Sequence, residues 1–138
     1  MRILGLDFGT KTIGVALSDE LTITAQALTS VSRTALRRDL EALVRLIKEH
    51  GVEEVVIGLP VNMDGSRGPA AQAVADFIDR LQPLTVARII PWDERLTTVA
   101  AERILLEGDL SRRKRRQVID RLSAAIILQG YLDSRPKK

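Results

Sequence analysis

Residues 2–18, RILGLDFGTKTIGVALS, contain two short apolar runs separated by a turn. The first run, 2–8, is almost entirely apolar, which is typical of a strand that is covered on both faces. A tight turn is predicted at 9–11, and residues 11–18 read as a second strand. A third strand is expected within 21–31. Because the first connection is so short, these strands are predicted to form an antiparallel meander.

The rest of the chain alternates between helical and strand-like patterns. Leucine, valine and isoleucine recur at helical spacing over 34–50, and Gly51 is suited to end that helix. Residues 54–59, EVVIGL, form a β-branched apolar run that predicts a buried strand. The remaining predicted elements are a loop over 60–69, a helix over 70–81, a strand over 85–92, and helices over 96–107 and 113–132.

The order of these elements, β-β-β-α-β-α-β-α-α, predicts an α/β fold. An antiparallel meander of three strands followed by βαβ crossovers gives a mixed, five-stranded sheet with helices on both faces. The sequence contains no internal repeat, no low-complexity tract and no linker. We therefore expect residues 1–138 to form a single domain, which is an ordinary size for one hydrophobic core.

The composition excludes several classes of protein. Hydrophobic residues make up 45% of the chain and charged residues 28%, as in ordinary globular proteins. No apolar run approaches the roughly 20 residues that cross a bilayer, and Asp7 interrupts the N-terminal apolar stretch before a secretion signal could form. We therefore expect a cytoplasmic protein without membrane association. Since the chain has no cysteine, a disulfide framework, a thiolate metal site and a thiol nucleophile are excluded.

Positive charge is concentrated in clusters, although the net charge is only +3. Such clusters can be solvated surface and nothing more. They can also contact the phosphate backbone of a nucleic acid, where each neutralised phosphate releases counterions and makes binding salt-dependent. The pattern alone leaves both interpretations open. The longest cluster is an unbroken run of five, Arg112, Arg113, Lys114, Arg115 and Arg116, and smaller clusters lie at 33–38 and 135–138.

Asp7 is the first candidate site residue. A carboxylate in an otherwise apolar, buried strand is unfavourable unless it is paired or binds a cation. The sequence Asp-Phe-Gly-Thr at 7–10 places a turn and a hydroxyl directly after it. The alternative is an aspartate that caps this turn through its backbone amides, which short polar residues do routinely. This segment alone does not decide between a cap and a ligand.

Two adjacent acids, Asp93 and Glu94, follow the last predicted strand and precede a helix. Open α/β sheets tend to place their sites at this carboxyl end of a strand. The alternative is helix initiation, in which Thr97 or Thr98 caps the helix and an acid interacts with its N-terminal dipole. Helix initiation needs one acid only, so it accounts less well for two acids beside Arg95.

Asp120 is the third candidate and lies on the last predicted helix. It shares an arc of about 60° with Ala124, Ile127 and Tyr131, at the point where a basic half-helix meets an apolar one. A carboxylate there can be desolvated and still be reachable. The alternative is a surface ion pair with Arg116, worth about 0.3 to 0.5 kcal/mol. The opposite stripe, which we expect to face the core, comprises Val118, Leu122, Ala125 and Ile126.

The three acids gain meaning when they are considered together. Mg²⁺ and Mn²⁺ prefer carboxylate and phosphate oxygens and keep several waters. Such ions, bridged by carboxylates from separate elements, can orient a water for in-line attack on a phosphodiester. Asp7, Glu94 and Asp120 are therefore candidate metal ligands. Candidate contacts to the scissile phosphate are Thr10, Lys11 and Arg95, with the run over 112–116 on the flanking backbone.

Four motifs in the sequence resemble the RuvX family, also called YqgF. The match covers essentially the whole chain, in order and at compatible spacings. Members of this family are bacterial Holliday junction resolvases, also described as nucleases that mature the end of precursor small-subunit ribosomal RNA. The motifs are DFGTKTIGVA at 7–16, GLP at 58–60 with DGS at 64–66, DERLTT at 93–98, and ID at 119–120 followed by AA at 124–125 and LQ at 128–129.

The resemblance implies a ribonuclease H-like fold, a divalent-metal phosphodiesterase activity and a nucleic-acid substrate, either branched DNA or a ribosomal RNA precursor. By motif position, it implies that Asp7, Glu94 and Asp120 are the catalytic acids that bind Mg²⁺ or Mn²⁺. Related enzymes often carry the second acid on the strand that pairs with the first, which here ends in GLP at 58–60. The acid comes one strand later, so Asp93 rivals Glu94 as the second ligand.

Two other functions fit parts of the sequence. The segment DFGTKTIGV is close to the phosphate-holding loop of actin-like and sugar-kinase-like ATPases, but those proteins need two such domains around the nucleotide. The chain could instead be a non-catalytic nucleic-acid or ribosome-assembly module whose acids serve as caps and ion-pair partners. Metal-dependent thermal stabilisation that is lost on changing Asp7 or Asp120 would favour the metal-dependent nuclease over the binding module. A resolvase that cuts two strands symmetrically would also favour a homodimer with two-fold symmetry.

Overall fold

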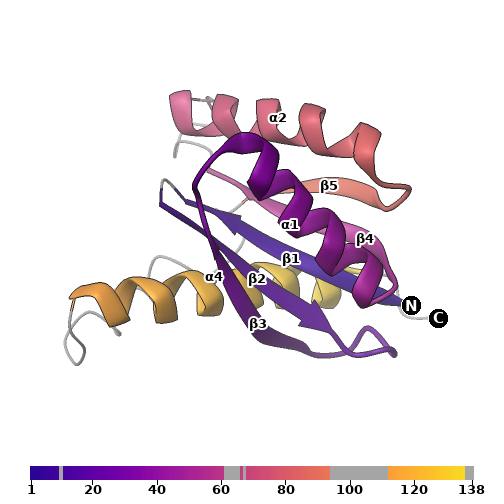
Figure 1. Ribbon diagram of the computed structural model, residues 1–138. Helices are drawn as coiled ribbons and strands as arrows, with labels where there is room; N and C mark the ends of the chain where they lie inside the picture. Colours follow the sequence, from indigo (N-terminus) through magenta and orange to yellow (C-terminus); the bar gives the residue numbers. More distant parts are fainter. Residues whose placement is uncertain (10, 61–65, 67, 94–111, 136–138) are drawn as a thin grey trace.

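The structure, a computed structural model, describes residues 1–9, 11–60, 66, 68–93 and 112–135, with the side chains of 112–120 left out. Its centre is a five-stranded sheet with the strand order β3-β2-β1-β4-β5 (Figure 1). The first strand of the chain is therefore the middle strand of the sheet. The strands are β1 (Arg2–Phe8), β2 (Thr12–Ser18), β3 (Ala25–Ser32), β4 (Val52–Leu59) and β5 (Arg88–Asp93).

The sheet is mixed, as the sequence predicts. Strands β1, β2 and β3 form the antiparallel meander. On the other side of β1, strands β4 and β5 add in parallel. The predicted pairing of β1 with the strand that ends in GLP is confirmed, because Leu6 lies opposite Ile57 in the parallel register.

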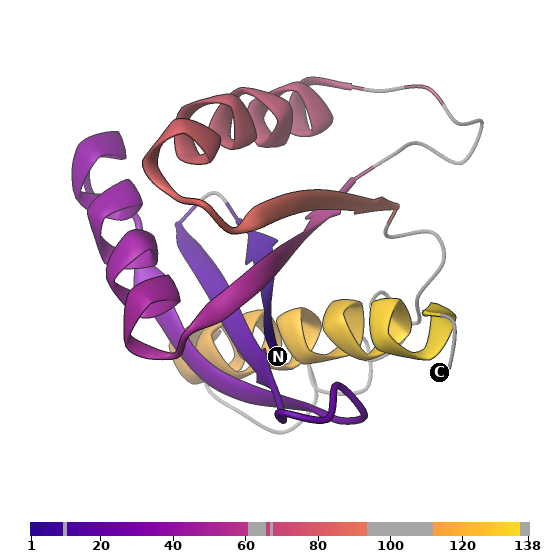
Figure 2. The same cartoon turned by 90° about the vertical axis from the view of Figure 1, so that its right-hand side faces the viewer.

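Helices cover both faces of the sheet, which confirms the predicted arrangement. Helices α1 (Leu36–Glu49) and α2 (Pro69–Leu81) pack on one face, and α4 (Arg112–Ser134) packs on the other (Figure 2). Their bounds agree with the predicted helices to within two residues at either end. Gly51, at a φ of 59°, ends α1 in the left-handed conformation that favours glycine. The helix predicted over 96–107 lies outside the described residues.

Strand β5 begins at Arg88, so the prediction that this strand begins at residue 85 is wrong. A short 3₁₀ turn, η1 (Gln82–Leu84), ends α2. The side-chain amide of Gln82 then donates to the carbonyl of Ala87 at 2.9 Å, and the amide of Ala87 donates to the hydroxyl of Thr85 at 3.1 Å. These side-chain bonds take up backbone groups that a strand would use, so this segment forms a turn.

Residues of β1 alternate between two separate cores, one on each face of the sheet. Leu4 and Leu6 belong to the core under α1 and α2, and Ile3 belongs to the core under α4. By the same alternation, Gly5 and Asp7 face α4. The core under α1 and α2 is completed mainly by Ile13, Val15, Leu43, Val55, Ile57, Val74, Phe77 and Leu81.

Helix α4 lies directly on β1 at Gly5. A Cβ atom at Gly5 would stand 2.7 Å from the Cβ of Leu128 and 3.0 Å from the carbonyl oxygen of Ala124, so only glycine fits this approach. One step before Gly5 on this face, Ile3 lies beside Glu54 of β4, which contacts Tyr131. Residue numbers therefore rise along β1 in the direction in which they fall along α4, so the helix runs antiparallel to β1.

The face of α4 that packs on the sheet differs from the predicted stripe. Ala124, Ile127 and Leu128 are fully buried, whereas Leu122 is 37% exposed. The prediction placed Leu122 on the core stripe together with Ala125 and Ile126, which are only half-buried. From residue 123 onward the helix is apolar nearly all round, so periodicity could not choose a face. The close approach over Gly5 decides it, because the backbone of Ala124 and the side chain of Leu128 lie against Gly5.

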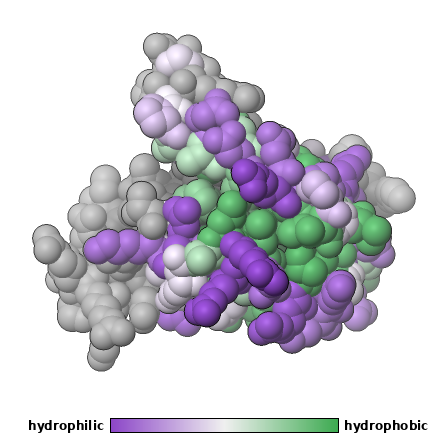
Figure 3. Space-filling model, turned by 45° about the horizontal axis from the view of Figure 1, so that its top comes forward, coloured by the Kyte–Doolittle hydropathy of each residue, from purple (hydrophilic) through white to green (hydrophobic). Residues whose placement is uncertain are grey.

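The face formed by α1 and the end of α2 carries exposed apolar side chains (Figure 3). Leu36 and Leu84 are 42% and 49% exposed. A hollow of about 400 Å³ lies between α1 and η1 and is lined by Glu41, Val44, Arg45, Lys48 and Leu84. None of the helices in the described part of the chain is long and apolar enough to cross a membrane.

Candidate active site

Asp7 lies near the carboxyl end of β1, on the sheet face that α4 covers, and is only 4% exposed. Its partner on β2 is Gly14. Continuing the parallel register by one residue beyond the Leu6–Ile57 pair places Gly58 of β4 on its other side. Neither flanking strand therefore contributes a side chain beside Asp7 in this row of the sheet.

The backbone of α4 brings position 120 to the level of Asp7. Gly5 lies beneath Ala124, and Asp7 is two residues further along β1, about 6.6 Å away at the usual rise of a strand. Asp120 is four residues before Ala124, about 6 Å along the helix axis. Because the two elements are antiparallel, these two steps run in the same direction. The backbone of α4 at position 120 therefore lies toward the end of β1 that carries Asp7. The Asp120 side chain lies outside the described ones, so its convergence with Asp7 stays a prediction.

The second predicted acid falls at the carboxyl end of β5. Trp92 lies opposite the row of Gly58 and faces α4, where its ring meets the ring of Tyr131 edge-on at 5.6 Å. Asp93, the last residue of β5, is in register with Leu59, which belongs to the core on the other face. Asp93 is thus directed to the face opposite Asp7. Glu94 and Arg95 lie outside the described residues.

The turn between β1 and β2 is held in one tight conformation. The Gly9 amide donates to the carbonyl of Thr12 at 2.9 Å. A Cβ atom at Gly9 would stand 2.7 Å from the same carbonyl oxygen, so glycine is required here. Lys11 is exposed on this turn, two residues after Gly9 and four residues after Asp7. Thr10 lies outside the described residues.

The basic run over 112–116 forms the start of α4. Figure 1 shows this half of the helix, in orange, extending past the sheet on the side toward which β1 runs. The run therefore lies on the same side of the molecule as Asp7. Its side chains are outside the described ones, so the prediction that they contact a nucleic-acid backbone stays a prediction.

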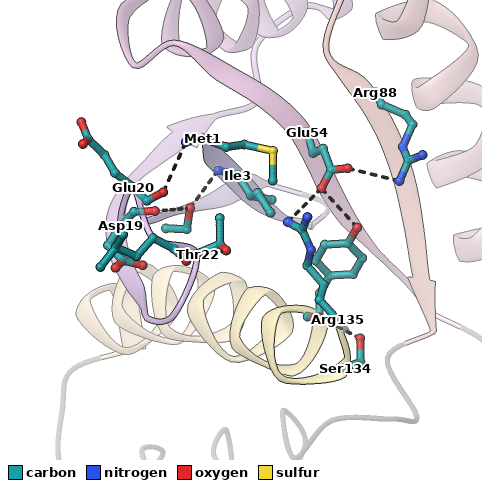
Figure 4. A network of polar contacts seen from close by, with 12 residues as sticks. Met1, Ile3, Asp19, Glu20, Thr22, Glu54, Arg88, Ser134 and Arg135 are labelled. Carbon is teal, nitrogen blue, oxygen red and sulfur yellow. Dashed lines mark hydrogen bonds and ion pairs between the residues drawn. The ribbon is translucent and has the colours of Figure 1, made fainter. Parts of the chain in front are cut away.

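Another carboxylate on the α4 side of the sheet, the half-buried Glu54 of β4, was not singled out from the sequence. Its side chain is 13% exposed and lies 3.1 Å from the guanidinium of Arg88 and 3.3 Å from that of Arg135. The hydroxyl of Tyr131 donates to the same carboxylate at 3.2 Å (Figure 4). Burial and the negative charge of Glu54 together raise the pKa of Tyr131. This cluster fastens the end of α4 to the starts of β4 and β5.

Gln129, which belongs to the fourth sequence motif, has a role in the fold. Its side-chain oxygen accepts from the amide of Ala25 at 2.9 Å, and its nitrogen donates to the carbonyl of Ile23 at 2.9 Å. Both bonds tie α4 to the start of β3. The same nitrogen lies 2.9 Å from the Asp133 carboxylate one turn later. Gln129 therefore fixes the helix that carries Asp120 and makes its contacts far from Asp7.

Of the three acids predicted to bind a metal ion, the structure describes the side chain of Asp7. Among the side chains that the structure describes, no three acidic, histidine or cysteine residues gather closely enough to hold a metal ion. Glu94 and Asp120 are not among those side chains, so the predicted set of three is left untested. What the structure does provide is one ligand of suitable chemistry, a buried carboxylate flanked by glycines at the end of the central strand.

Two solved structures share this fold at low sequence identity. RuvC of T. thermophilus, solved in complex with a Holliday junction substrate, gives a TM-score of 0.61 at 14% identity, over 96% of this chain and 95% of that one. The Holliday junction resolvase of fowlpox virus gives a TM-score of 0.56 at 14% identity, over 98% of this chain and 100% of that one. These likenesses confirm the predicted ribonuclease H-like fold.

Sequence relatives match over nearly the full chain. A protein of Moorella thermoacetica named "Putative pre-16S rRNA nuclease" is 62% identical over 133 residues, which are 96% of this chain and 95% of its own. A protein of Carboxydothermus hydrogenoformans with the same name is 54% identical over 137 residues, 99% of each chain. The family model for RuvX, described as Holliday junction resolvase, matches residues 1–134. The chain therefore belongs to the RuvX family of Holliday junction resolvases.

Proposed function

We propose that this protein is a divalent-metal-dependent endonuclease that hydrolyses phosphodiester bonds in structured nucleic acid. The substrate is four-way junction DNA or the 5′ end of precursor small-subunit ribosomal RNA. The observation that carries the proposal is Asp7, a buried carboxylate at the end of the central strand with glycine neighbours on both sides. Membership of the RuvX family, and relatives named for pre-16S rRNA cleavage, support a nuclease.

The chemistry of Asp7 suits a Mg²⁺ or Mn²⁺ ion. A buried carboxylate needs a compensating positive charge or several hydrogen bonds, and hard divalent cations prefer oxygen ligands. Asp120, at the level of Asp7 on α4, and Glu94, directly after β5, would complete the set. One or two ions held there would supply an activated water and stabilise the leaving oxygen of the cleaved strand.

The alternation of β5 favours Glu94 over Asp93 as the second ligand. Trp92 faces α4, and Asp93 faces the opposite side of the sheet, in register with Leu59. A strand that continued by one residue would return position 94 to the face of Asp7. We therefore assign the metal-binding role to Glu94 and give Asp93 none.

The protein's own cations would hold the substrate. Lys11, exposed on the turn that follows Asp7, would contact the scissile phosphate, and so would Thr10, its neighbour in the sequence. Arg95 would add a second positive charge beside Glu94. The basic run over 112–116, on the side of the molecule where β1 ends, would bind flanking phosphates and make affinity fall steeply with salt.

Cleavage by matched variants tests this proposal. A four-way DNA junction and a small-subunit ribosomal RNA precursor are each incubated with Mn²⁺ or Mg²⁺ and wild-type protein, Asp7→Asn or Asp79→Asn. Asp79 is an exposed acid of α2, so its variant controls for the loss of one negative charge. We expect Asp7→Asn to lose about 100-fold or more of the cleavage rate and Asp79→Asn to match wild type.

Two results would contradict this proposal. Equal cleavage by wild type and Asp7→Asn would remove Asp7 from the site. Salt-dependent binding of both substrates without cleavage by wild type would favour the non-catalytic binding module.

The two substrates also bear on oligomeric state, because symmetrical cuts in a junction need two active sites. Sedimentation of the protein on a four-way junction would show whether two copies bind together, as we propose for junction cleavage.

A further inference from the structure

Arg33 and Asp39 form an ion pair next to the β1–β2 turn, outside the set of residues that the sequence assigns to the site. Asp39 lies in the first turn of α1 and is only 3% exposed. Its carboxylate accepts from the amide of Thr34 at 3.1 Å and lies 3.9 Å from the Nε of Arg33. The buried acid therefore holds the guanidinium from one side.

The other side of the Arg33 guanidinium meets the turn that follows Asp7. Its Nη1 donates to the carbonyl oxygen of Gly9 at 2.9 Å, and its centre lies 4.3 Å from the centre of the Phe8 ring. The backbone amide of Arg33 also donates to the carbonyl of Lys11 at 2.8 Å. Arg33, directly after β3, thus contacts this turn at three residues, Phe8, Gly9 and Lys11.

These bonds complete the fixation of Gly9. Its amide is already bound to the carbonyl of Thr12 within the turn, and its carbonyl is bound by Arg33 from outside. Phe8 is held in turn by α2, because its ring centre lies 4.6 Å from that of Phe77. Both backbone polar groups of Gly9 are therefore satisfied, and the turn is anchored to β3, α1 and α2 together.

We propose that Arg33, oriented by Asp39, is a positioning residue that fixes the β1–β2 turn so that Lys11 meets the scissile phosphate beside Asp7. The inference rests on the proposed nuclease function. Reaction rates are sensitive to misplacement of about 1 Å in the groups that orient the substrate, and a site is only as rigid as the residues that support it. A turn without the Arg33 anchor would sample several conformations of Lys11.

The kinetic test compares Arg33→Ala and Arg33→Lys with a matched arginine on α1. Arg37→Ala is the control, since Arg37 is exposed and contacts Glu41 one turn later at 3.2 Å. We expect Arg33→Ala to lower kcat about 10- to 100-fold with KM and the salt dependence of binding unchanged. Arg33→Lys keeps the charge but lacks the fork that reaches two acceptors, so it should restore only part of kcat. Arg37→Ala should match wild type.

A second readout reports the turn itself and does not depend on activity. Hydrogen exchange of the Gly9 amide should become faster in Arg33→Ala, while exchange of the buried amides of β4 and the melting temperature change little. Asp39→Asn, which removes the charge that orients Arg33, should shift kcat and Gly9 exchange in the same direction by a smaller factor. This combination separates loss of positioning from general loss of stability.

Four results would overturn this inference. An unchanged kcat in Arg33→Ala, with faster Gly9 exchange, would leave the turn anchor without a role in the reaction. A raised KM with a weaker salt dependence and a normal kcat would make Arg33 a direct phosphate contact. A wild-type protein that cleaves neither substrate would overturn the proposed function and this inference together. Cleavage by wild type and Arg33→Ala alike, with none by Asp7→Asn, would overturn this inference alone.

Discussion

Two carboxylates, the buried Asp7 and the half-buried Glu54, lie on the same face of the sheet, at its opposite ends, and their surroundings differ. Glu54, near the start of β4, is bound by Arg88, Arg135 and the hydroxyl of Tyr131 (Figure 4). Asp7, near the end of β1, has glycine as its neighbour on each flanking strand. Both acids interrupt an apolar strand under α4. The chain supplies two arginines beside the acid at one end, and it places glycines on the strands that flank the acid at the other.

The groups that surround a carboxylate indicate its role. A carboxylate that two arginines of its own chain surround is already neutralised, so its contribution is to join the elements that carry those arginines. The glycines that flank Asp7 place no side chain of β2 or β4 beside it in its row of the sheet. We therefore treat Glu54 as part of the framework and propose Asp7 for the site.

The largest expected effect is on cleavage, and it should separate these two acids. Asp7→Asn should lower the rate about 100-fold or more, because an amide is a poor ligand for a divalent cation. Glu54→Gln should stay within a few-fold of wild type under the same conditions. Rates measured with excess enzyme on one substrate suffice. Comparable losses in the two variants would show that the ends of the sheet are not distinct in function.

Metal binding should follow the same division. Saturating Mn²⁺ should stabilise wild-type protein by about 2.7 kcal/mol at a metal concentration of 100 times Kd, which thermal unfolding with and without the ion would show. Asp7→Asn should lose most of this stabilisation, whereas Glu54→Gln should retain it in full even though its starting stability is lower. A stabilisation that persists in Asp7→Asn would place the ion elsewhere.

Stability should respond in the opposite sense to cleavage. Glu54→Gln leaves Arg135 without its carboxylate and should lower the free energy of unfolding by about 1 to 2 kcal/mol. The lower end of this range is expected if solvent screens Arg88, which is 71% exposed. Asp7→Asn removes a buried charge and should be neutral or stabilising. Urea unfolding measures both, with Glu53→Gln, an exposed neighbour on β4, as the control.

The sequence was sufficient for features that depend on local pattern. The order of the described strands and helices is confirmed, and it follows from hydrophobic periodicity and from glycine positions, which act over a few residues. The pairing of β1 with the GLP strand, which the family resemblance implied, is confirmed as well. The family motifs added the fold and the identity of the acids to be considered.

Features that depend on contacts between distant segments could not be predicted. The sheet-facing side of α4 follows from the fit of Ala124 over Gly5, two residues that are far apart in the sequence. Glu54, like Asp7, is an acid in a mostly apolar strand, and only the positions of Arg88 and Arg135 reveal its role. The choice between Asp93 and Glu94 likewise needed the pairing of β5 with β4.

The smallest expected effect concerns the pH dependence of stability at the Glu54 end. Burial and the charge of Glu54 raise the pKa of Tyr131 above its ordinary value of 10.0, because both disfavour the phenolate. The folded protein therefore retains this proton at a pH where the unfolded chain has lost it. The resulting stability is fully present below pH 10 and is lost as the pH rises through the folded pKa.

Removing the Tyr131 hydroxyl should remove this pH dependence and little else. The free energy of unfolding of Tyr131→Phe, measured by urea titration at several values from pH 9 to pH 11, should fall less steeply than that of wild type. Metal-dependent cleavage at neutral pH should be unchanged, because the cluster around Glu54 is at the far end of the sheet from Asp7. Parallel slopes for the two proteins would mean that the Glu54 cluster does not hold the phenol proton. A loss of cleavage in Tyr131→Phe would instead couple the two ends of the sheet through α4, the helix that touches both.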